Sequence, residues 1–332
     1  MIEMSKRVWA TVDLSAFKKN LALVSKLCPN SKIFPVVKSN AYGHGMEKIA
    51  TAVSGSSQKV AGLAVATIQE AAELHKLELS HPILPMNGFL TKDELCLSME
   101  LNLDVVLHAN YQVELVQELI REKPLDKKTR FWVKMNTGMN RLGMFPEECQ
   151  TAIAFLKSVA NAEVVFMTHL ACADDMGNSE SKSFTNKQLK RFRQTEGELK
   201  LELAEKLQTS ISASAGILTL TEAHRDYVRP GIMLYGSSPL VEKNGEDLGL
   251  HPVMTLSSRL IAIKEVQAGE GIGYGATYVC KKETKVGTVS IGYGDGYPRS
   301  ARNGTPVLIK TSKNIFRTQI IGRVSMDMIT VD

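Results

Sequence analysis

Apolar residues recur at spacings of three and four along the segment that follows Asp13. The apolar positions of this segment are Leu14, Phe17, Leu21, Val24 and Leu27. The spacing predicts an amphipathic helix, for which Asp13 is a suitable N-cap. An apolar run at residues 33–37 then precedes a Gly-rich turn at residues 42–45 and a second helical stretch from Met46. This order predicts a strand, a turn and a helix.

The alternation of strand-like and helix-like segments continues as far as residue 239. The later strand-like runs begin at Val60, Pro82, Leu103, Arg130, Ala162, Ser210 and Tyr227. Two of the helices between them open with the spacing of a capping box, Thr67 with Glu70 and Thr91 with Glu94. Eight alternating units over about 240 residues fit a closed parallel barrel better than an open sheet. We therefore predict a (β/α)8 TIM-type barrel.

The residue pattern of the sequence changes after Pro239. Runs of β-branched residues are broken there by Gly, Asn and Pro, and the helical period is lost. This predicts a mainly β C-terminal domain. We expect the barrel domain to cover residues 1–241 and the β domain residues 242–332, with residues 1–12 pairing with the β domain. The polar loop at residues 242–249 is the expected linker. The last residues, 326–332, alternate like a strand without a closing turn, so we expect the β domain to continue beyond them.

Composition narrows the choice of partners. The 332 residues are 44% hydrophobic and 23% charged, which excludes a disordered or collagen-like chain. A formal net charge of +5 is too small to argue for nucleic acid or a membrane surface. No apolar run reaches the roughly 18 residues that a membrane helix needs. The five cysteines are scattered without a C-x-x-C pair, so we expect no disulfide framework, no metal site and a reducing cytoplasmic location.

Polar residues stand where most of the predicted strands end, which is the active-site face of such barrels. Lys38 follows an apolar strand, and an amine among buried side chains can condense with an aldehyde to form an imine. Small residues after strands seven and eight, Ser214 and Gly231, suit a phosphate. Together these features suggest pyridoxal phosphate. His169 at the end of strand six and Arg229 on strand eight are further polar groups at this face. Ordinary alternatives are an exposed loop lysine for Lys38, a satisfied core histidine for His169 and half of a structural ion pair for Arg229.

Seven motifs of the sequence resemble those of a known family. The motifs that carry the resemblance are PVVKSNAYGHG, NTGMNRLGM, THLACAD, DYVRPGIMLYG, GIGYGATY, SIGYGDGYPR and GRVSMD, in order from Lys38 to Asp327. They are similar to those of alanine racemase, a pyridoxal-phosphate enzyme with an N-terminal (β/α)8 barrel and a C-terminal β domain. The resemblance implies a homodimer with shared active sites that interconverts L- and D-alanine, supplying D-alanine for peptidoglycan.

The resemblance also implies the catalytic roles. Lys38 would hold the cofactor covalently and then act as the base on one face of the substrate. Tyr274 of the partner subunit would be the base on the opposite face. Arg229 would hydrogen-bond the pyridine nitrogen, and His169 would lie between Arg229 and the partner's Tyr274.

The remaining implied contacts surround the cofactor and the entrance. The phosphate would be held by Tyr42, Ser214, Gly231 and Ile232. Arg141 and the partner's Met326 would contact the substrate, and Lys134 matches a lysine that is often carbamylated in the family and then braces Arg141. The entrance would be formed by Tyr293, Asp174, Arg299 and Arg323.

Departures from the family pattern are few. Asn140 stands where Gly is common, and we expect Asn to tolerate the left-handed backbone there. Family members usually have a further phosphate-binding tyrosine near the C-terminal end of their sequences. It has no counterpart before Asp332 in this sequence.

Three other functions stay open. A racemase of another or a broader range of amino acids differs only in the pocket around Tyr293 and Met326. A one-domain barrel that binds pyridoxal phosphate without catalysis would lack the GYGATY and SMD segments. A decarboxylase on the same kind of barrel would place an acidic residue where Arg229 stands.

Overall fold

The computed structural model describes residues 6–56, 58–204 and 207–332. The chain forms two compact units, one of residues 13–253 and the other of residues 254–332 together with the segment before Asp13. Because that segment is described only from residue 6, the expectation for residues 1–5 lies outside the described residues.

Eight parallel strands close into a barrel in the larger unit. They are β2 (Lys32–Ile33), β3 (Leu63–Val65), β4 (Ile83–Pro85), β5 (Val105–Leu107), β6 (Thr129–Lys134), β7 (Ala162–Met167), β8 (Gln208–Ala213) and β9 (Tyr227–Arg229). Six of them form the sheet β2-β9-β8-β7-β6-β5, and β3 pairs with β4. Val36 bridges to Ala64 of β3, and the Asp104 N–H donates to Ile83 O of β4 at 2.9 Å, so the ring is complete. The predicted (β/α)8 barrel is confirmed.

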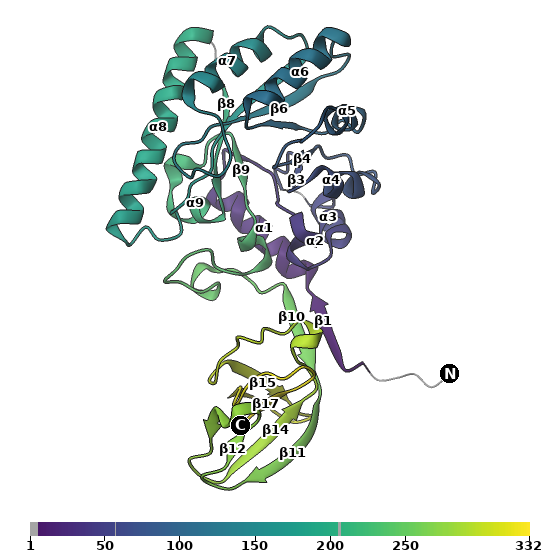
Figure 1. Cartoon of the computed structure of the whole chain (residues 1–332), viewed down its shortest axis with the longest axis vertical. Helices are drawn as coiled ribbons and strands as arrows, with labels where there is room; N and C mark the ends of the chain where they lie inside the picture. The colour runs from purple at the N-terminus through teal and green to yellow at the C-terminus, as the bar shows by residue number, and fades with distance from the viewer. Residues whose placement is uncertain (1–5, 57, 205–206) are drawn as a thin grey trace. The chain divides into compact units, whose positions relative to one another are not determined.

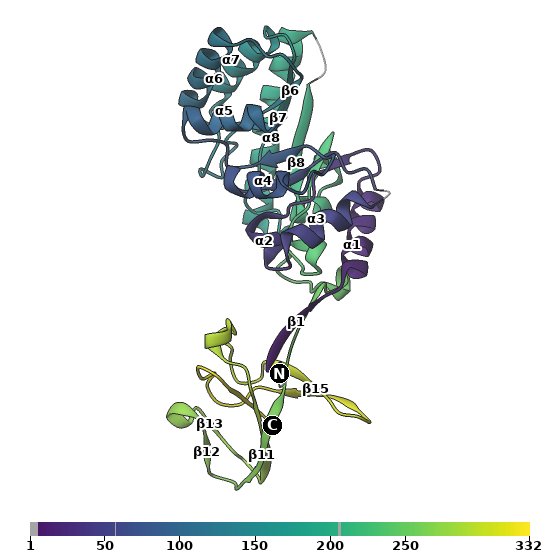
Figure 2. The same cartoon turned by 90° about the vertical axis from the view of Figure 1, so that its right-hand side faces the viewer.

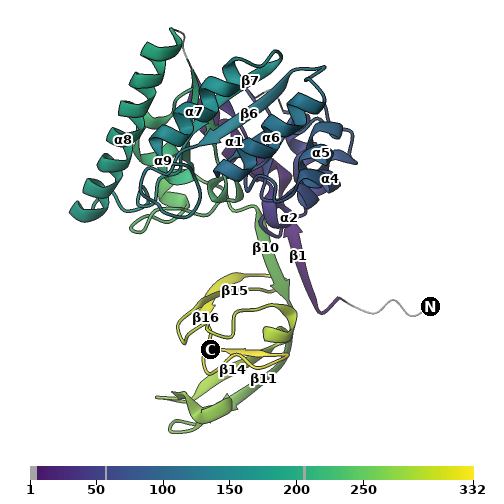
Figure 3. The same ribbon diagram turned by 45° about the horizontal axis from the view of Figure 1, so that its top comes forward.

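Helices surround the barrel (Figure 1). They are α1 (Leu14–Leu27), α2 (Lys38–Tyr42), α3 (Met46–Ser54), α4 (Ile68–His75), α5 (Lys92–Glu100), α6 (Asn110–Glu122), α7 (Pro146–Lys157), α8 (Ser179–Leu203) and α9 (Ser214–Thr219). Two predicted caps are present: Asp13 Oδ1 accepts from the N–H groups of Ser15 and Ala16, and Thr67 and Glu70 form a capping box. The box predicted at Thr91 is only half formed, because Thr91 accepts from Glu94 N–H but Glu94 accepts from Leu90 N–H instead of from Thr91. Figure 3 shows α7 beside the long helix α8, and the two are in contact.

The last barrel strand differs from the sequence pattern. The strand-like run that begins at Tyr227 forms a strand only as far as Arg229, the end of β9, and a 3-10 turn, η2 (Ile232–Tyr235), follows. Pro230 has no N–H to continue the ladder. Helix α1 packs against η2 and α3, and Figure 2 shows α1 beside α3. The helix that precedes the first barrel strand therefore covers the place where an eighth helix would follow β9.

The barrel interior is filled by side chains that point inward from the strands. Its buried cluster consists of Phe34, Val36, Ala64, Leu84, Val106, Trp132, Val165, Met167 and Tyr227. Trp132 shows the alternation along β6, because its neighbours Phe131 and Val133 belong to the cluster between the strands and the helices. Burial of these apolar surfaces holds the barrel rigid beneath the strand ends.

The division between the units falls after Val253, whereas the sequence placed it in the loop at residues 242–249. Residues 242–253 stay with the barrel because Leu250 and Val253 are only 3% and 1% exposed. Asn20 of α1 fixes the segment, donating to His251 O at 2.8 Å and accepting from His251 N–H at 2.8 Å. These contacts join residues that are far apart in sequence, so the local residue pattern does not reveal them.

The smaller unit is built from antiparallel strands. They are β1 (Val8–Val12), β10 (Met254–Ser258), β11 (Leu260–Val266), β12 (Gly271–Ile272), β13 (Tyr278–Val279), β14 (Thr284–Val289), β15 (Pro306–Lys310), β16 (Ile315–Gln319) and β17 (Ile329–Val331). Strand β1 pairs with β10, and β14 lies between β11 and β17. The mainly β character predicted for this part of the chain is confirmed. None of the described helices has the length and apolar content needed to cross a membrane.

Candidate active site

A cavity of about 310 Å³ lies at the carboxyl ends of the barrel strands. The predicted site residues that line it are Lys38, Tyr42, Arg141, His169, Asp174, Ser214, Arg229, Gly231 and Ile232. These residues stand at or just after the ends of five different strands, so the barrel rather than any local motif brings them together. Lys134, at the end of β6, is not among the lining residues of this cavity.

Lys38 opens a turn with unusual backbone geometry. The four residues after it, Ser39 to Tyr42, have φ between 52° and 54°, although none is glycine. A left-handed conformation costs an L-residue about 1–2 kcal/mol, so the surrounding structure must hold this turn. Within it, the N–H of Ala41 donates to Val37 O at 2.8 Å and the N–H of Gly43 to Ser39 O at 3.0 Å. The turn fixes where the lysine side chain leaves the backbone.

Arg229 is a buried cation at the end of β9. Its guanidinium donates to Ser210 Oγ, to Thr168 O at 2.7 Å and to Ile211 O at 3.3 Å. In the part of the chain that the structure describes, no carboxylate forms an ion pair with Arg229, which disfavours the ion-pair alternative. Burial lowers the pKa of Arg229 to about 10, so the group is charged at neutral pH. It can therefore donate hydrogen bonds into the cavity.

Ser214, Gly231 and Tyr42 form a narrow polar cradle. Ser214 Oγ accepts from the N–H groups of Gly231 at 2.9 Å and Met233 at 3.4 Å. A Cβ atom at residue 231 would lie 2.5 Å from Tyr42 Oη, so only glycine leaves the tyrosine in place. Burial raises the pKa of Tyr42, which keeps its hydroxyl protonated as a donor. Donors around a small space fit a phosphate group.

Positive charge dominates the electrostatics of the cavity. Burial and the charges of Arg229 and Lys134 lower the pKa of His169 to about 3, which keeps the ring neutral. Burial and the charges of Arg229, Arg141 and Lys38 lower the pKa of Lys134 to about 8. Such a field favours an anionic ligand with a phosphate and a carboxylate. The residues present therefore fit pyridoxal phosphate bound with an amino acid.

The loop that carries Arg141 is held from both sides. Asn136 Oδ1 accepts from the N–H groups of Gly138 and Asn140 at 3.0 and 3.1 Å. Asn140 has φ of 56°, the left-handed backbone that was expected for this position. On the other side, Gln188 of α8 donates to Thr137 Oγ1 at 3.0 Å. Hydrogen bonds therefore fix the loop that carries the exposed Arg141.

The other predicted residues belong to the smaller unit. Tyr274 opens a 3-10 turn, η4 (Tyr274–Ala276), and its side chain is 74% exposed. Tyr293 opens η5 (Tyr293–Asp295), with the Arg299 guanidinium 5.9 Å from its ring centre. The exposed Met326 adjoins η5, because its carbonyl accepts from Gly294 N–H at 2.8 Å. The remaining residue of this group, the exposed Arg323, lies beside Gly275 next to Tyr274.

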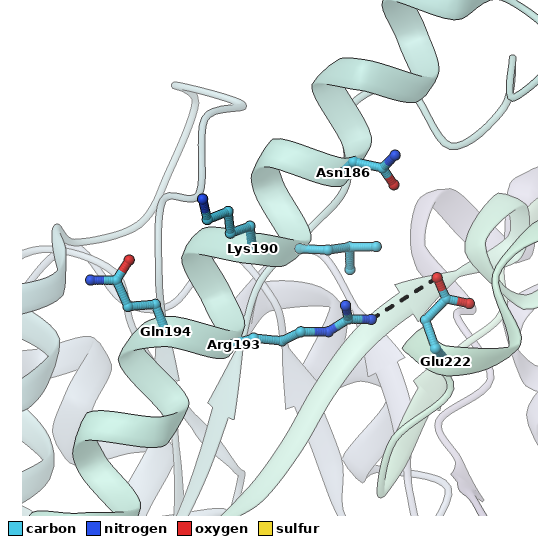
Figure 4. Close-up of a pocket in the computed structure, with 6 residues that line it drawn as sticks. Asn186, Lys190, Arg193, Gln194 and Glu222 are labelled. Atoms are coloured by element: carbon cyan, nitrogen blue, oxygen red, sulfur yellow. Dashed lines mark ion pairs between the residues drawn. The ribbon is translucent and has the colours of Figure 1, made fainter.

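A second hollow on the barrel surface does not share this chemistry. It is lined by side chains of α8 and by Glu222, which pairs with Arg193 at 4.0 Å (Figure 4). Lys190, Arg193 and Glu222 are exposed, and no residue from a strand end reaches the hollow. None of the predicted site residues lines this hollow.

Comparisons with known proteins identify the family of this chain. Models of the N-terminal and C-terminal domains of alanine racemase match residues 12–239 and 253–332. An alanine racemase from Vibrio vulnificus strain CMCP6 is 41% identical over 329 residues, 98% of this chain and 86% of that protein. The crystal structure of the biosynthetic alanine racemase from Pseudomonas aeruginosa is 40% identical with a TM-score of 0.86, covering 99% of this chain and 86% of that one. This chain belongs to the alanine racemase family.

Members of the alanine racemase family are racemases that depend on pyridoxal phosphate, so the predicted enzyme class and cofactor are confirmed at the level of the family. A further solved relative is the alanine racemase from Bartonella henselae with covalently bound pyridoxal phosphate. It is 29% identical with a TM-score of 0.80, covering 99% of this chain and 86% of that one. The match over residues 253–332 disfavours the one-domain cofactor-binding alternative.

Sequence reasoning missed two side chains that hold the site. Glu70 was noted as a capping residue of α4, but one of its oxygens also accepts from the N–H of Ser39, next to Lys38. Gln188 lies on a polar helix and is nevertheless only 1% exposed. Local pattern does not reveal these roles, because the groups that Glu70 and Gln188 reach lie far from them in sequence.

Proposed function

We propose that this chain interconverts L- and D-alanine with pyridoxal phosphate held covalently by Lys38. The observation that carries the proposal is the cavity in which an amine, a buried guanidinium and a small donor cradle meet at the strand ends. Pyridoxal phosphate, when bound, supplies the electron withdrawal that acidifies the Cα–H bond of an amino acid.

Cofactor binding falls to residues with distinct tasks. The hydroxyl of Tyr42, Ser214 and the backbone of Gly231 and Ile232 would hold the phosphate. Arg229 would donate a hydrogen bond to the pyridine nitrogen. Because a guanidinium does not readily give up a proton, an acceptor that faces it stays unprotonated.

Racemisation needs a base on each side of Cα, because one fixed group cannot easily serve both faces. Lys38 Nζ would remove or return the proton on one face. Tyr274 Oη of a second copy of the chain would do so on the other. In one direction of the reaction, the first base takes the Cα proton and the second donates a proton to the opposite face of Cα. The amino acid therefore loses one proton and gains one. The neutral ring of His169 would lie between Arg229 and the partner's Tyr274.

The substrate and the entrance involve both copies. Arg141, with the partner's Met326, would contact the amino acid. We propose that Lys134 carries a carbamate that braces Arg141, which is supported by the lowered pKa of its amine. Tyr293, Asp174, Arg299 and Arg323 would form the entrance. A homodimer follows from this account, since Tyr274 must come from across an interface.

We further propose a cytoplasmic enzyme whose D-alanine is used for peptidoglycan. The five cysteines are all free, which suits a reducing compartment. The activity is tested by a coupled assay for conversion of L-alanine to D-alanine with purified protein. Lys38→Ala should lose covalently bound cofactor, whereas Tyr274→Phe should keep it and lose racemisation. A protein that binds cofactor but racemises no amino acid would contradict the proposal.

A further inference from the structure

Glu70 joins the left-handed turn after Lys38 (residues 39–42) to helix α4, which follows the next barrel strand, β3. One carboxylate oxygen, Oε2, accepts from the N–H of Ala66 at 2.7 Å at the start of α4. The other oxygen, Oε1, accepts from the N–H of Ser39 at 2.6 Å. Ser39 follows Lys38 directly, so the carboxylate holds the peptide unit through which the lysine enters the left-handed turn.

The same helix cap occurs elsewhere in the barrel without this second contact. At α5, Glu94 Oε2 accepts from the N–H of Leu90 at 2.7 Å, and Thr91 accepts from Glu94 N–H as Thr67 does from Glu70 N–H. At α7, Glu148 Oε2 accepts from Phe145 N–H at 2.7 Å, while its other oxygen accepts from the Asn110 side chain. Capping therefore explains one oxygen of Glu70, and the contact to Ser39 is additional.

The turn depends on contacts of this kind because its backbone conformation is unfavourable. Each of the four consecutive non-glycine residues with positive φ costs about 1–2 kcal/mol, so the turn needs compensating contacts. One further side-chain contact is Asn40 Oδ1, which accepts from the N–H of Met46 at 2.8 Å. A hydrogen bond to a carboxylate is stronger than one between neutral groups. Glu70 thus acts at the start of the turn, where Lys38 is attached.

We propose that Glu70 is a positioning residue for Lys38. It touches neither substrate nor cofactor and acts by fixing the peptide after the lysine, so the amine reaches both the cofactor and the substrate Cα. The inference rests on the proposed function, in which Lys38 is the covalent attachment point and one of the two bases.

The test compares Glu70→Gln with Glu94→Gln in the full-length holoenzyme. Glutamine keeps one acceptor oxygen, so at Glu70 it can serve Ala66 or Ser39 but not both. At Glu94 the same change alters only a cap. The readouts are hydrogen exchange of peptides spanning residues 37–45, the fraction of protein with cofactor covalently attached to Lys38, and kcat and KM for alanine.

For Glu70→Gln we expect faster exchange in residues 39–42, less covalently attached cofactor at limiting pyridoxal phosphate, and kcat lowered about tenfold with KM for alanine little changed. Glu94→Gln should match the wild type in all three readouts. Equal behaviour of the two variants would overturn the inference and leave Glu70 as a cap. If Glu70→Gln folds poorly, Glu70→Asp retains the charge but is too short to span both N–H groups, and the same losses are expected.

The proposed function can fail separately. Wild-type protein that neither attaches the cofactor at Lys38 nor racemises alanine would overturn that function, and this inference with it. Active wild type with unaffected Glu70 variants would overturn only the role of Glu70.

Discussion

Gln188 Nε2 donates a hydrogen bond to Thr137 Oγ1 at 3.0 Å, which joins helix α8 to the loop that carries Arg141. The same amide donates to His169 O at 3.2 Å, and its oxygen accepts from Ala171 N–H at 2.9 Å. One buried side chain therefore holds the loops after β6 and β7 in register.

Replacing Gln188 by Met should loosen these loops at similar side-chain volume. The partly buried N–H of Ala171 would lose its acceptor and the buried Thr137 Oγ1 would lose a donor, which together cost about 1–3 kcal/mol of unfolding free energy. Because Arg141 would be less well placed, KM for alanine should rise several-fold. Urea unfolding and steady-state kinetics measure both effects. Gln194→Met, at an exposed position of the same helix, serves as the control. An unchanged KM in the Gln188 variant would show that the loop needs no brace from α8.

Gly231→Ala should weaken cofactor binding without unfolding the barrel. The new methyl group would meet Tyr42 Oη, and the displaced hydroxyl would leave the phosphate cradle. Overpacking of this kind costs about 1–3 kcal/mol, so we expect roughly tenfold weaker binding of pyridoxal phosphate. Equilibrium titration of apoprotein measures the affinity. Gly197→Ala on α8, where a Cβ meets nothing within 4 Å, should bind normally.

Lys134 should react with carbon dioxide at neutral pH. With a pKa of about 8, roughly a quarter of this amine is neutral at pH 7.5, and a neutral amine adds to CO2 with release of a proton. Incubation with ¹³C-bicarbonate should give a carbamate signal in the ¹³C NMR spectrum that decreases as the pH is lowered. The signal should be lost in Lys134→Ala and kept in Lys128→Ala, a change at an exposed lysine. A signal that survives Lys134→Ala would assign the carbamate to another amine.

Asp104 should make the stability of the barrel depend on pH. Burial raises the pKa of Asp104 to about 6, although Arg130 and the indole N–H of Trp132 contact the same oxygen. Since the folded pKa lies above the unfolded one, the folded state favours the protonated carboxyl. Its contribution to the unfolding free energy is complete below about pH 4 and is lost as the pH rises through about 6, with a size of about 3 kcal/mol.

Urea unfolding of the wild type and of Asp104→Asn between pH 4.5 and 7.5 measures this contribution. The stability of the wild type relative to Asp104→Asn should fall across that range. Asp126→Asn, at an exposed position, should run parallel to the wild type. Parallel curves for Asp104→Asn would mean that the Arg130 contact cancels the effect of burial.

The sequence predicted the features that depend on local pattern. The helix from Leu14 to Leu27, its Asp13 cap and the alternation of strands and helices follow from spacing alone. The cavity also follows in outline, because the ends of parallel strands meet at one face. Roles within it came from motifs that resemble a family rather than from physical argument.

What the sequence could not give rests on contacts between distant segments. The left-handed turn after Lys38 contains no glycine before Gly43, so nothing local indicates positive φ there. The end of the barrel unit at Val253 depends on Asn20, more than two hundred residues earlier. Glu70 and Gln188 are ordinary polar residues on helices, and only the folded chain shows which backbone groups they reach.

In the proposed mechanism, one active site uses Lys38 of one copy and Tyr274 of another. Mixing inactive Lys38→Ala with inactive Tyr274→Phe under conditions that exchange subunits tests it most directly, with heterodimers verified by native mass spectrometry. A mixed dimer would contain one site with both bases. If the subunits exchange statistically, the mixture should therefore show about a quarter of wild-type racemase activity. Verified heterodimers that are no more active than the separate variants would contradict the shared site.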